Sequence, residues 1–198
     1  MKILGINCSP RKGQTTLYAL EQCLEAARKE QAGLETEIVE LGAMDIHGCC
    51  ACGRCKETLK CSIDDDFTGI ISKLCDDEVK GIVIGTPVYF GTMTSQCKAF
   101  LDRTVMFRRN GFLFRNRVGA VLAVGGVRNG GQELTIQAVH AAMLCHDMII
   151  VGDGMNTSHF GASLYSGIEG GIKNDEVGLI TAQNLGRRMV GIINMLQN

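Results

Sequence analysis

Short apolar runs alternate with helical patterns along the chain, and this alternation constrains the fold more than any other feature. The runs are nearly continuous in apolar residues, as expected for strands whose two faces are both covered. Glycine clusters follow the runs, where a strand gives way to a loop. The expected strands are 1–7, 36–40, 81–86, 118–124 and 148–151, and the expected helices are 15–31, 66–75, 95–103, 132–145 and about 175–196.

Five strand-helix units predict an α/β fold with a doubly wound, five-stranded parallel sheet. Right-handed crossovers and the number of strands favour the flavodoxin-like order 2-1-3-4-5. In that order, ligands bind beyond the carboxyl ends of strands one, three and four. No internal repeat, low-complexity tract or Pro/Ser-rich linker interrupts the pattern, so we expect one domain over residues 1–198.

Composition excludes several classes of protein. The formal net charge is -1, so nothing favours nucleic acid as a partner. No apolar run approaches the roughly 18 to 20 residues of a membrane span, and residues 1–6 enter a strand-like segment without a basic leader. We therefore expect a cytoplasmic protein with no membrane partner. In that reducing compartment, dense cysteines indicate metal binding or catalysis rather than disulfides.

A cysteine-rich segment follows the second strand, with the spacing C-x2-C-x2-C-x5-C. Thiolates two residues apart turn inward on one short loop, and a fourth closes the cage, which is the arrangement that iron-sulfur ligation needs. We interpret residues 41–65 as a functional insertion, because structureless connections of this length are uncommon in compact domains. The candidate metal ligands are Cys49, Cys52, Cys55 and Cys61.

Three neighbouring features allow other interpretations. Cys50 competes with Cys49 as the first ligand, although only Cys49 gives the even spacing. His47 raises the possibility of zinc, but four cysteines make a histidine ligand unnecessary. The acidic run 64–66 precedes Phe67 and a helical pattern, so it fits helix capping better than metal binding.

Residues 7–16 connect the first strand to the first helix and have the properties of a phosphate-binding loop. Backbone N–H groups at a helix start lack partners, and together with hydroxyl groups they can surround a phosphate dianion. The spacing is neither that of a nucleotide triphosphatase nor that of a dinucleotide fold, and a monophosphate such as that of FMN suits the short loop. An ordinary polar turn with a threonine cap is the alternative. The candidate residues are Ser9, Arg11, Gln14, Thr15 and Thr16.

The loops after the third and fourth strands offer contacts for a planar ring. In the first of these loops a proline stiffens the backbone and two aromatic side chains present a face. In the second, glycines let main-chain N–H groups approach a ligand closely. The candidate residues are Pro87, Val88, Tyr89, Phe90 and Gly91 after the third strand, and Gly125, Gly126, Arg128, Gly131, Gln132 and Glu133 after the fourth.

Together these motifs resemble the NADPH-dependent FMN reductase superfamily. Its members carry S-P-R-x-G-x-[ST] after strand one, P-V-Y-x-G after strand three and a double-glycine motif ending in Gln-Glu after strand four. The resemblance spans nearly the whole chain. Within the superfamily, the cysteine spacing and the segments 101–104, 108–109, 128–133 and 158–161 resemble most the iron-sulfur flavoproteins of anaerobes.

This resemblance implies FMN at the three loops and a homodimer or homotetramer. It also implies a 4Fe-4S cluster on the four cysteines, close to an FMN across the subunit interface. Electrons would pass from a low-potential donor such as ferredoxin, through the cluster, to FMN and then to a two-electron acceptor. The alternative is a cluster-free NAD(P)H-dependent flavin or quinone reductase. A third hypothesis is a zinc-stabilised interaction module without redox chemistry.

Overall fold

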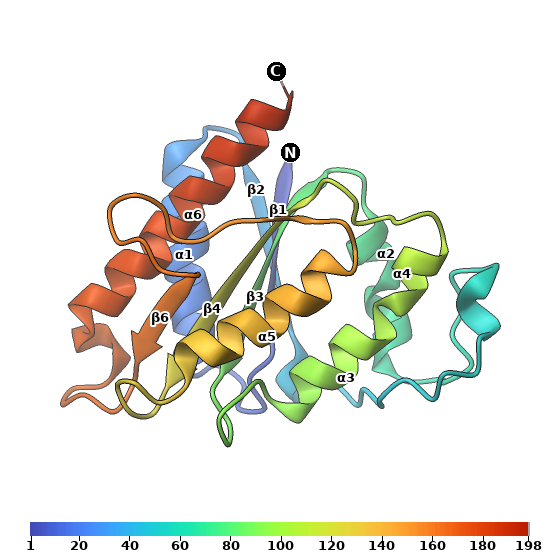
Figure 1. The fold of residues 1–198 in the computed structure, drawn as a ribbon, viewed down its shortest axis with the longest axis horizontal. Coiled ribbons are helices and arrows are strands. Elements are labelled where there is room, and N and C mark those ends of the chain that lie inside the picture. Colours follow the sequence, from blue (N-terminus) through green and yellow to red (C-terminus); the bar gives the residue numbers. More distant parts are fainter. Residues whose placement is uncertain (198) are drawn as a thin grey trace.

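The computed structural model describes residues 1–197 and contains a parallel sheet with helices on both faces (Figure 1). The strand order is β2-β1-β3-β4-β5, and β6 also pairs with β4, so the predicted flavodoxin-like order is confirmed. Every pairing between these strands is parallel. The strands are β1 (Lys2–Asn7), β2 (Glu35–Glu40), β3 (Val79–Pro87), β4 (Val118–Gly125), β5 (Ile149–Ile150) and β6 (Ala162–Tyr165).

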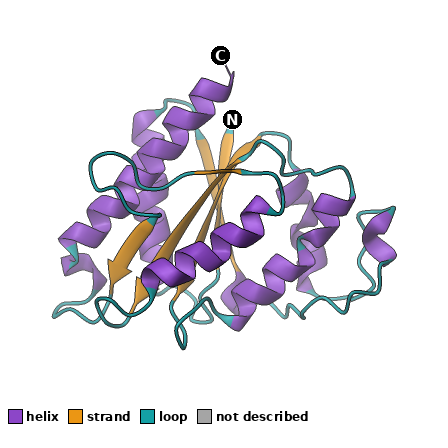
Figure 2. Ribbon diagram, in the orientation of Figure 1, coloured by secondary structure: helices purple, strands orange, loops and turns teal. Residues whose placement is uncertain are grey.

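Two helical layers cover the sheet (Figure 2). Leu24 of α1 shares one apolar core with Ile3, and Phe100 of α3 shares the other with Leu4. Ile3 and Leu4 are neighbours in β1, and they separate because successive side chains of a strand point to opposite faces. The helices are α1 (Thr15–Glu30), α2 (Ile71–Cys75), α3 (Ser95–Arg103), α4 (Val105–Arg109), α5 (Gln132–Leu144) and α6 (Glu176–Gln197), with 3-10 turns η1 (Leu41–Ala43), η2 (Arg54–Lys56), η3 (Asp66–Ile70) and η4 (Ile172–Asn174).

The fifth position of the sheet differs from the expectation because two short strands share it. β5 pairs with the start of β4 and β6 with its end, and residues 151–161 form a loop between them. The outward N–H of Ser163 donates to Thr181 Oγ1 at 3.1 Å, and that of Tyr165 donates to Asp175 Oδ2 at 2.6 Å. These side chains near the start of α6 satisfy edge groups that an open strand would leave unpaired. The sequence pattern predicted β5 but missed β6.

Most predicted helices agree with the structure to within one or two residues, with two differences. The expected helix 66–75 is a 3-10 turn, η3, followed by α2, and α4 was not predicted. Asp65 caps η3 through a hydrogen bond from the Phe67 N–H at 3.2 Å, which confirms the capping role of the acidic run. Within residues 1–197, no helix combines the length and apolar character needed to cross a bilayer.

The carboxyl ends of β1, β3 and β4 lie along one edge of the sheet, at the bottom of Figure 1. The loops that follow these strands therefore meet at one edge, as the order 2-1-3-4-5 requires. The cysteine-rich segment, coloured cyan, lies at the right of the same view, beside α4. The fold thus places the two candidate sites on different parts of the surface.

Candidate functional site

The loop after β1 is shaped by its own side chains. Ser9 is buried, and its N–H donates to Asn7 Oδ1 at 3.2 Å. The Ser9 hydroxyl accepts from the N–H of Arg11 at 3.2 Å and donates to the Arg11 carbonyl oxygen at 3.1 Å. The side chains of Arg11 and Gln14 extend into solvent. Ser9 therefore fixes the path of the loop, whereas Arg11 and Gln14 are exposed to a ligand, with only a long hydrogen bond of 3.5 Å from Gln14 Nε2 to the Lys12 carbonyl oxygen.

A carboxylate from the neighbouring strand reaches into this loop. Glu40, the last residue of β2, accepts from the Gly13 N–H at 3.1 Å and from Asn7 Nδ2 at 3.0 Å. The Gly13 N–H and the Asn7 side chain thus already donate to an anionic group, the Glu40 carboxylate, when no ligand is bound. The sequence analysis missed Glu40, although parallel pairing of the first two strands places it opposite Asn7.

The start of α1 leaves further hydrogen-bonding groups without protein partners. Gln14 is the N-cap, and its side chain makes no capping hydrogen bond. Thr16, in the first turn, is 1% exposed, and its hydroxyl has no partner among residues 1–197. A buried hydroxyl without a partner destabilises a fold, unless a ligand supplies the missing group. The phosphate of FMN fits this position, because it would accept from the hydroxyl and from the free N–H groups of the helix start.

The loop after β3 ends in a tight turn. Tyr89 and Thr92 exchange backbone hydrogen bonds of 2.8 and 3.2 Å, which leaves Phe90 and Gly91 at the tip. Both tip residues have positive φ values, of 49° and 87°. The Phe90 side chain is fully exposed and Tyr89 is 43% exposed. Both aromatic rings can therefore contact a ligand, and neither belongs to the hydrophobic core.

The loops after β3 and β4 touch at their glycines. A Cβ atom at Gly131 would lie 3.4 Å from the carbonyl oxygen of Gly91 and 3.6 Å from Val88 Cγ1. Gly131 has a φ of +98° and is the N-cap of α5. The structure thus brings the second and third candidate loops together at one edge of the sheet.

Gln132 builds the third loop from inside. Its Nε2 donates to the carbonyl oxygens of Val127 at 2.8 Å and Leu164 at 3.3 Å, and its Oε1 accepts from the Gly130 N–H at 2.7 Å. Residue 125 must be glycine for this arrangement, because a Cβ there would lie 2.1 Å from Gln132 Nε2. The Gln132 amide is therefore occupied within the protein and supports the loop.

The other predicted residues of the third loop face outward. Arg128 is largely exposed, lies 5.2 Å above the ring of Tyr165, and forms an ion pair of 3.4 Å with buried Asp175. Glu133 is exposed, and nothing lies within 4 Å of the position where Gly126 would carry a Cβ. The Cα of Gly126 is thus open to a ligand on the side where a Cβ would stand, whereas its carbonyl oxygen lies close to Gly167.

Five cysteines line one small pocket beside α3 and α4. The four predicted ligands are among them, and the fifth is Cys50. Arg103, Met106 and Arg109 from the two helices close the opposite wall. Cys55 is buried, whereas Cys49, Cys50 and Cys52 are exposed. Folding therefore gathers all the candidate thiols, and it does not separate Cys49 from Cys50 as the first ligand.

The thiols share a pocket without converging on one point. Among residues 1–197, no three His, Cys, Asp or Glu side chains are grouped as ligands of a single metal ion. A tetrahedral zinc site needs four donors around one ion, whereas four cysteines hold an iron-sulfur cluster of several irons. A four-cysteine donor set suits either group, so the common pocket fits an iron-sulfur cluster, and the preference for a cluster over zinc rests on the cysteine spacing.

Hydrogen bonds favour the thiolate form of Cys52 in this pocket. Cys52 Sγ lies 3.0 Å from Ser62 Oγ, and this hydrogen bond, followed by one from the Arg54 N–H, lowers the pKa of Cys52 below its usual range. Arg109 Nη1 donates to Cys55 Sγ at 3.6 Å. Thiolates are the form of cysteine that binds metal, so these contacts suit ligation.

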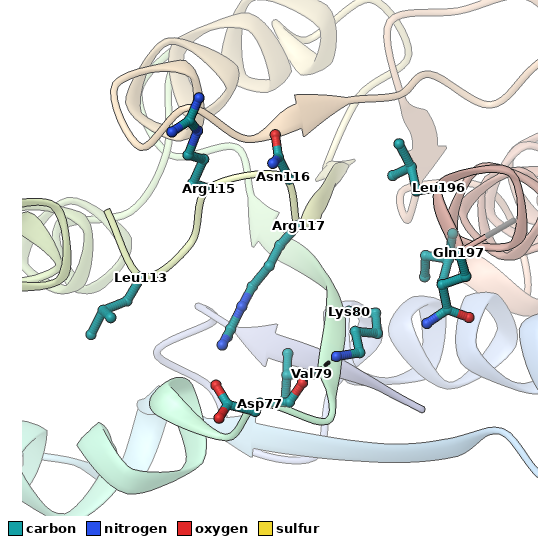
Figure 3. A pocket seen from close by; sticks show the side chains of 10 residues that line it. Asp77, Val79, Lys80, Leu113, Arg115, Asn116, Arg117, Leu196 and Gln197 are labelled. Carbon is teal, nitrogen blue, oxygen red and sulfur yellow. Dashed lines mark hydrogen bonds between the residues drawn. The ribbon is translucent and has the colours of Figure 1, made fainter. Parts of the chain in front are cut away.

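A larger cavity lies at the opposite end of the sheet and contains none of these features. It has a volume of about 620 Å³, and its walls include Lys80, Arg115 and Arg117, which come from or precede β3 and β4 (Figure 3). Arg117 crosses toward Asp77 in that view, and its guanidinium donates to the carbonyl oxygens of Leu74 at 2.7 Å and Asp76 at 3.1 Å. These bonds give Arg117 a structural role away from both candidate sites.

The model of one protein family, described as NADPH-dependent FMN reductase, matches residues 1–162. The chain belongs to this family. An iron-sulfur flavoprotein of Methanocaldococcus jannaschii is 42% identical over 197 residues, covering 100% of both chains. An iron-sulfur flavoprotein of Methanosarcina thermophila is 41% identical over 197 residues, covering 100% of this chain and 97% of the relative. These matches place the chain with the iron-sulfur flavoproteins of the FMN reductase family, as the sequence motifs predicted.

A solved structure supports the same fold. RosB with a bound 8-demethyl-8-formylriboflavin-5'-phosphate intermediate has a TM-score of 0.71 and 21% sequence identity, over 100% of this chain and 80% of that chain. At this identity the likeness concerns the fold. Membership of the FMN reductase family makes the protein an FMN-dependent oxidoreductase.

The sequence analysis named the segment 108–109 but missed two contacts that it and its neighbour make with the cysteine pocket of this family member. Asn110 Nδ2 donates to the carbonyl oxygen of Cys55 at 2.7 Å, and Arg109 contacts the same cysteine from 54 residues along the chain. No spacing rule connects residues so distant in sequence. Only the position of α4 against the loop reveals them.

Proposed function

We propose that the protein is an electron-transfer oxidoreductase that uses FMN and a 4Fe-4S cluster. In this proposal Cys49, Cys52, Cys55 and Cys61 hold the cluster, and a low-potential donor such as ferredoxin supplies electrons to a two-electron acceptor. The main support is the shared pocket of these thiols in a chain whose sheet edge also suits FMN. The cluster would supply one-electron chemistry, and FMN both one- and two-electron chemistry.

At the flavin edge, the residues bind and orient the cofactor. The Thr16 hydroxyl and the free N–H groups of α1 would hold the phosphate, with Thr15 beside them and Arg11 adding positive charge. The open Cα of Gly126 and the rings of Tyr89 and Phe90 would contact the flavin ring. Gln132 keeps its loop in shape, so that main-chain groups stay available.

The arrangement of the sites favours transfer between chains of a homodimer or homotetramer. The cysteine segment and the loop after β4 lie on different sides of the molecule in Figure 1. In an oligomer, the exposed cysteine segment of one chain could approach the flavin edge of another. We place this reaction in the cytoplasm, where thiols remain reduced.

Metal and flavin analysis tests the proposal directly. Protein purified and reconstituted without oxygen should contain about four irons and four sulfides per chain, together with one FMN. Protein with full flavin and no iron after anaerobic reconstitution would disprove the cluster assignment. A mixture of two differently tagged chains, one without cluster ligands and one with a weakened FMN site, tests transfer between subunits. Flavin reduction by dithionite-reduced ferredoxin in the mixed oligomer supports it.

The second candidate is a cluster-free NAD(P)H-dependent flavin or quinone reductase. One observation favours it: the matching family model is described as NADPH-dependent. Rapid bleaching of bound FMN by NADPH, at the same rate in wild type and in Cys52→Ser, would support this function. Bleaching by reduced ferredoxin alone would oppose it.

A further inference from the structure

Arg103, the last residue of α3, joins the two ends of the cysteine segment. Its Nη1 donates to the carbonyl oxygen of His47 at 3.0 Å, ahead of the first cysteine. Its Nη2 donates to the carbonyl oxygen of Ile63 at 3.4 Å, after the last cysteine. Both nitrogens also bind Asp65, at 2.6 and 3.0 Å. One side chain therefore closes the segment at its base.

The pair of Arg103 and Asp65 is almost completely buried, with both side chains 1% exposed. A buried ion pair is weak support for stability, because the desolvation of two charges offsets much of their attraction. The Arg103 guanidinium lies 4.7 Å from the centre of the Phe67 ring, which restrains its orientation. The Arg103 guanidinium is thus held in place by several contacts although burying its charge is unfavourable, which points to a role other than stability.

Arg103 also faces the cysteines. It lines the thiol pocket, whereas Asp65 does not, so the ion pair is a dipole with its positive end toward the sulfurs. The Nε of Arg103 is buried and has no hydrogen-bond partner among residues 1–197. Burial opposes the charge of Arg103, but the hydrogen bonds and charge of Asp65 favour it, and the pKa of Arg103 is raised.

We propose that Arg103 is a positioning residue of the cluster site, which fixes the ends of the cysteine segment and places a buried positive charge in the wall of the thiol pocket. This inference rests on the proposed function. Reduction adds negative charge to a cluster, so a nearby buried cation stabilises the reduced form. Hydrogen bonds to sulfur and net charge are among the factors that set cluster potentials. Arg103 would therefore raise the reduction potential.

Variants that remove one or both charges test the electrostatic part of the proposal, because they should shift the reduction potential in opposite directions. Asp65→Asn removes the opposing negative charge and keeps a good capping residue, so the potential should rise. The double variant Arg103→Gln/Asp65→Asn removes both charges without leaving one buried alone, so the potential should fall below that of Asp65→Asn. We expect at least a tenfold change in the ratio of oxidised to reduced cluster at a fixed potential, which for one electron equals about 59 mV.

The measurement is an anaerobic redox titration followed by electron paramagnetic resonance, with iron content determined on each sample. Arg108→Gln is the matched control, since Arg108 is an exposed arginine of α4 outside the pocket, and its potential should equal that of wild type. Equal potentials in Asp65→Asn and wild type, with full iron in both, would overturn the electrostatic role. Wild type without iron would instead overturn the proposed function.

Hydrogen exchange of the metal-free protein tests the positioning part independently. Arg103→Lys keeps the charge but loses the two-pronged contact with Asp65. Amide protons of residues 47–65 should exchange at least tenfold faster in this variant than in Arg108→Gln, while those of β1 and β3 stay unchanged. Equal exchange of residues 47–65 in the two variants would show that Arg103 does not hold the segment.

Discussion

The flavin edge and the cysteine pocket are built in different ways. At the flavin edge, hydrogen bonds within each loop link residues two to five apart in the chain, such as Ser9 with Arg11 and Gln132 with Val127, and longer links such as Glu40 with Gly13 come from the ends of neighbouring strands. In the cysteine pocket, side chains of α3 and α4 reach segments that lie 38 to 56 residues away. The first site depends on where strands end, and the second on how helices dock. Damage to one should therefore leave the other intact.

Loss of a cluster ligand is the most severe way to test this independence. Cys52→Ser should reduce the iron content of anaerobically reconstituted protein from about four per chain to less than about one. FMN content should remain that of wild type, because none of the candidate flavin-binding residues lines the cysteine pocket of the same chain. Iron analysis and the flavin absorbance of the same sample provide the measurement.

Cys145→Ser is the control for this change, since Cys145 is exposed at the end of α5 and does not line the pocket. It should keep both iron and flavin. Simultaneous loss of FMN and iron in Cys52→Ser would show that the two sites are coupled.

Acid should lower the free energy of unfolding through a buried histidine on the side of the molecule that carries the cysteine pocket. His146 is buried, and its Nε2 lies 2.9 Å from Oγ1 of Thr104, the residue that joins α3 to α4. Burial, and then the charge of Arg108, lowers the pKa of His146 to about 4. In the unfolded chain its pKa is about 6.5, so between these values only the unfolded chain binds the proton. The free energy of unfolding should therefore fall, by up to about 3 kcal/mol, as the pH drops from about 6.5 to 4.

Urea unfolding at several pH values in this range measures the effect. His146→Gln keeps a hydrogen-bonding group but cannot be protonated there, so its stability should depend less on pH than that of wild type. Parallel curves for wild type and His146→Gln would refute this assignment.

The third flavin loop should be sensitive to its internal support. Gln132→Ala leaves the Gly130 N–H and the carbonyl oxygen of Val127 without their partner, which should lower stability by about 2 kcal/mol. FMN should also bind more weakly, because the loop loses its shape. The exposed neighbour offers a matched control, and Glu133→Ala should change stability by less than about 0.5 kcal/mol. Chemical denaturation and flavin titration of both variants decide the point, and equal stabilities would contradict the supporting role.

The difference between local contacts at strand ends and long-range contacts made by docked helices also explains what the sequence predicted and what it did not. Continuous apolar runs identified β1, β3 and β4, because a strand covered on both faces leaves that pattern whatever its neighbours are. β6 was missed because it alternates buried and half-buried residues over a short span and relies on Thr181 and Asp175 of distant sequence. Cysteine spacing located the metal-binding segment, whereas the contacts of Arg103 depend on helix docking. Local patterns predict elements, and side chains that connect distant elements require coordinates.

Thr16 provides the finest distinction between a residue that supports the fold and one that serves a ligand. Its buried hydroxyl has no partner among the described residues, so Thr16→Val, which keeps the shape, should leave the flavin-free protein as stable as wild type or slightly more so. The same change should weaken FMN binding about tenfold, because a hydrogen bond to a charged phosphate contributes about 1.5 kcal/mol or more. Thr16→Ser retains the hydroxyl and should bind FMN nearly as well as wild type. Fluorescence titration of the flavin-free variants, with thermal unfolding alongside, separates the two effects. Lower stability with unchanged FMN affinity in Thr16→Val would mean that the hydroxyl serves the fold and that the phosphate lies elsewhere.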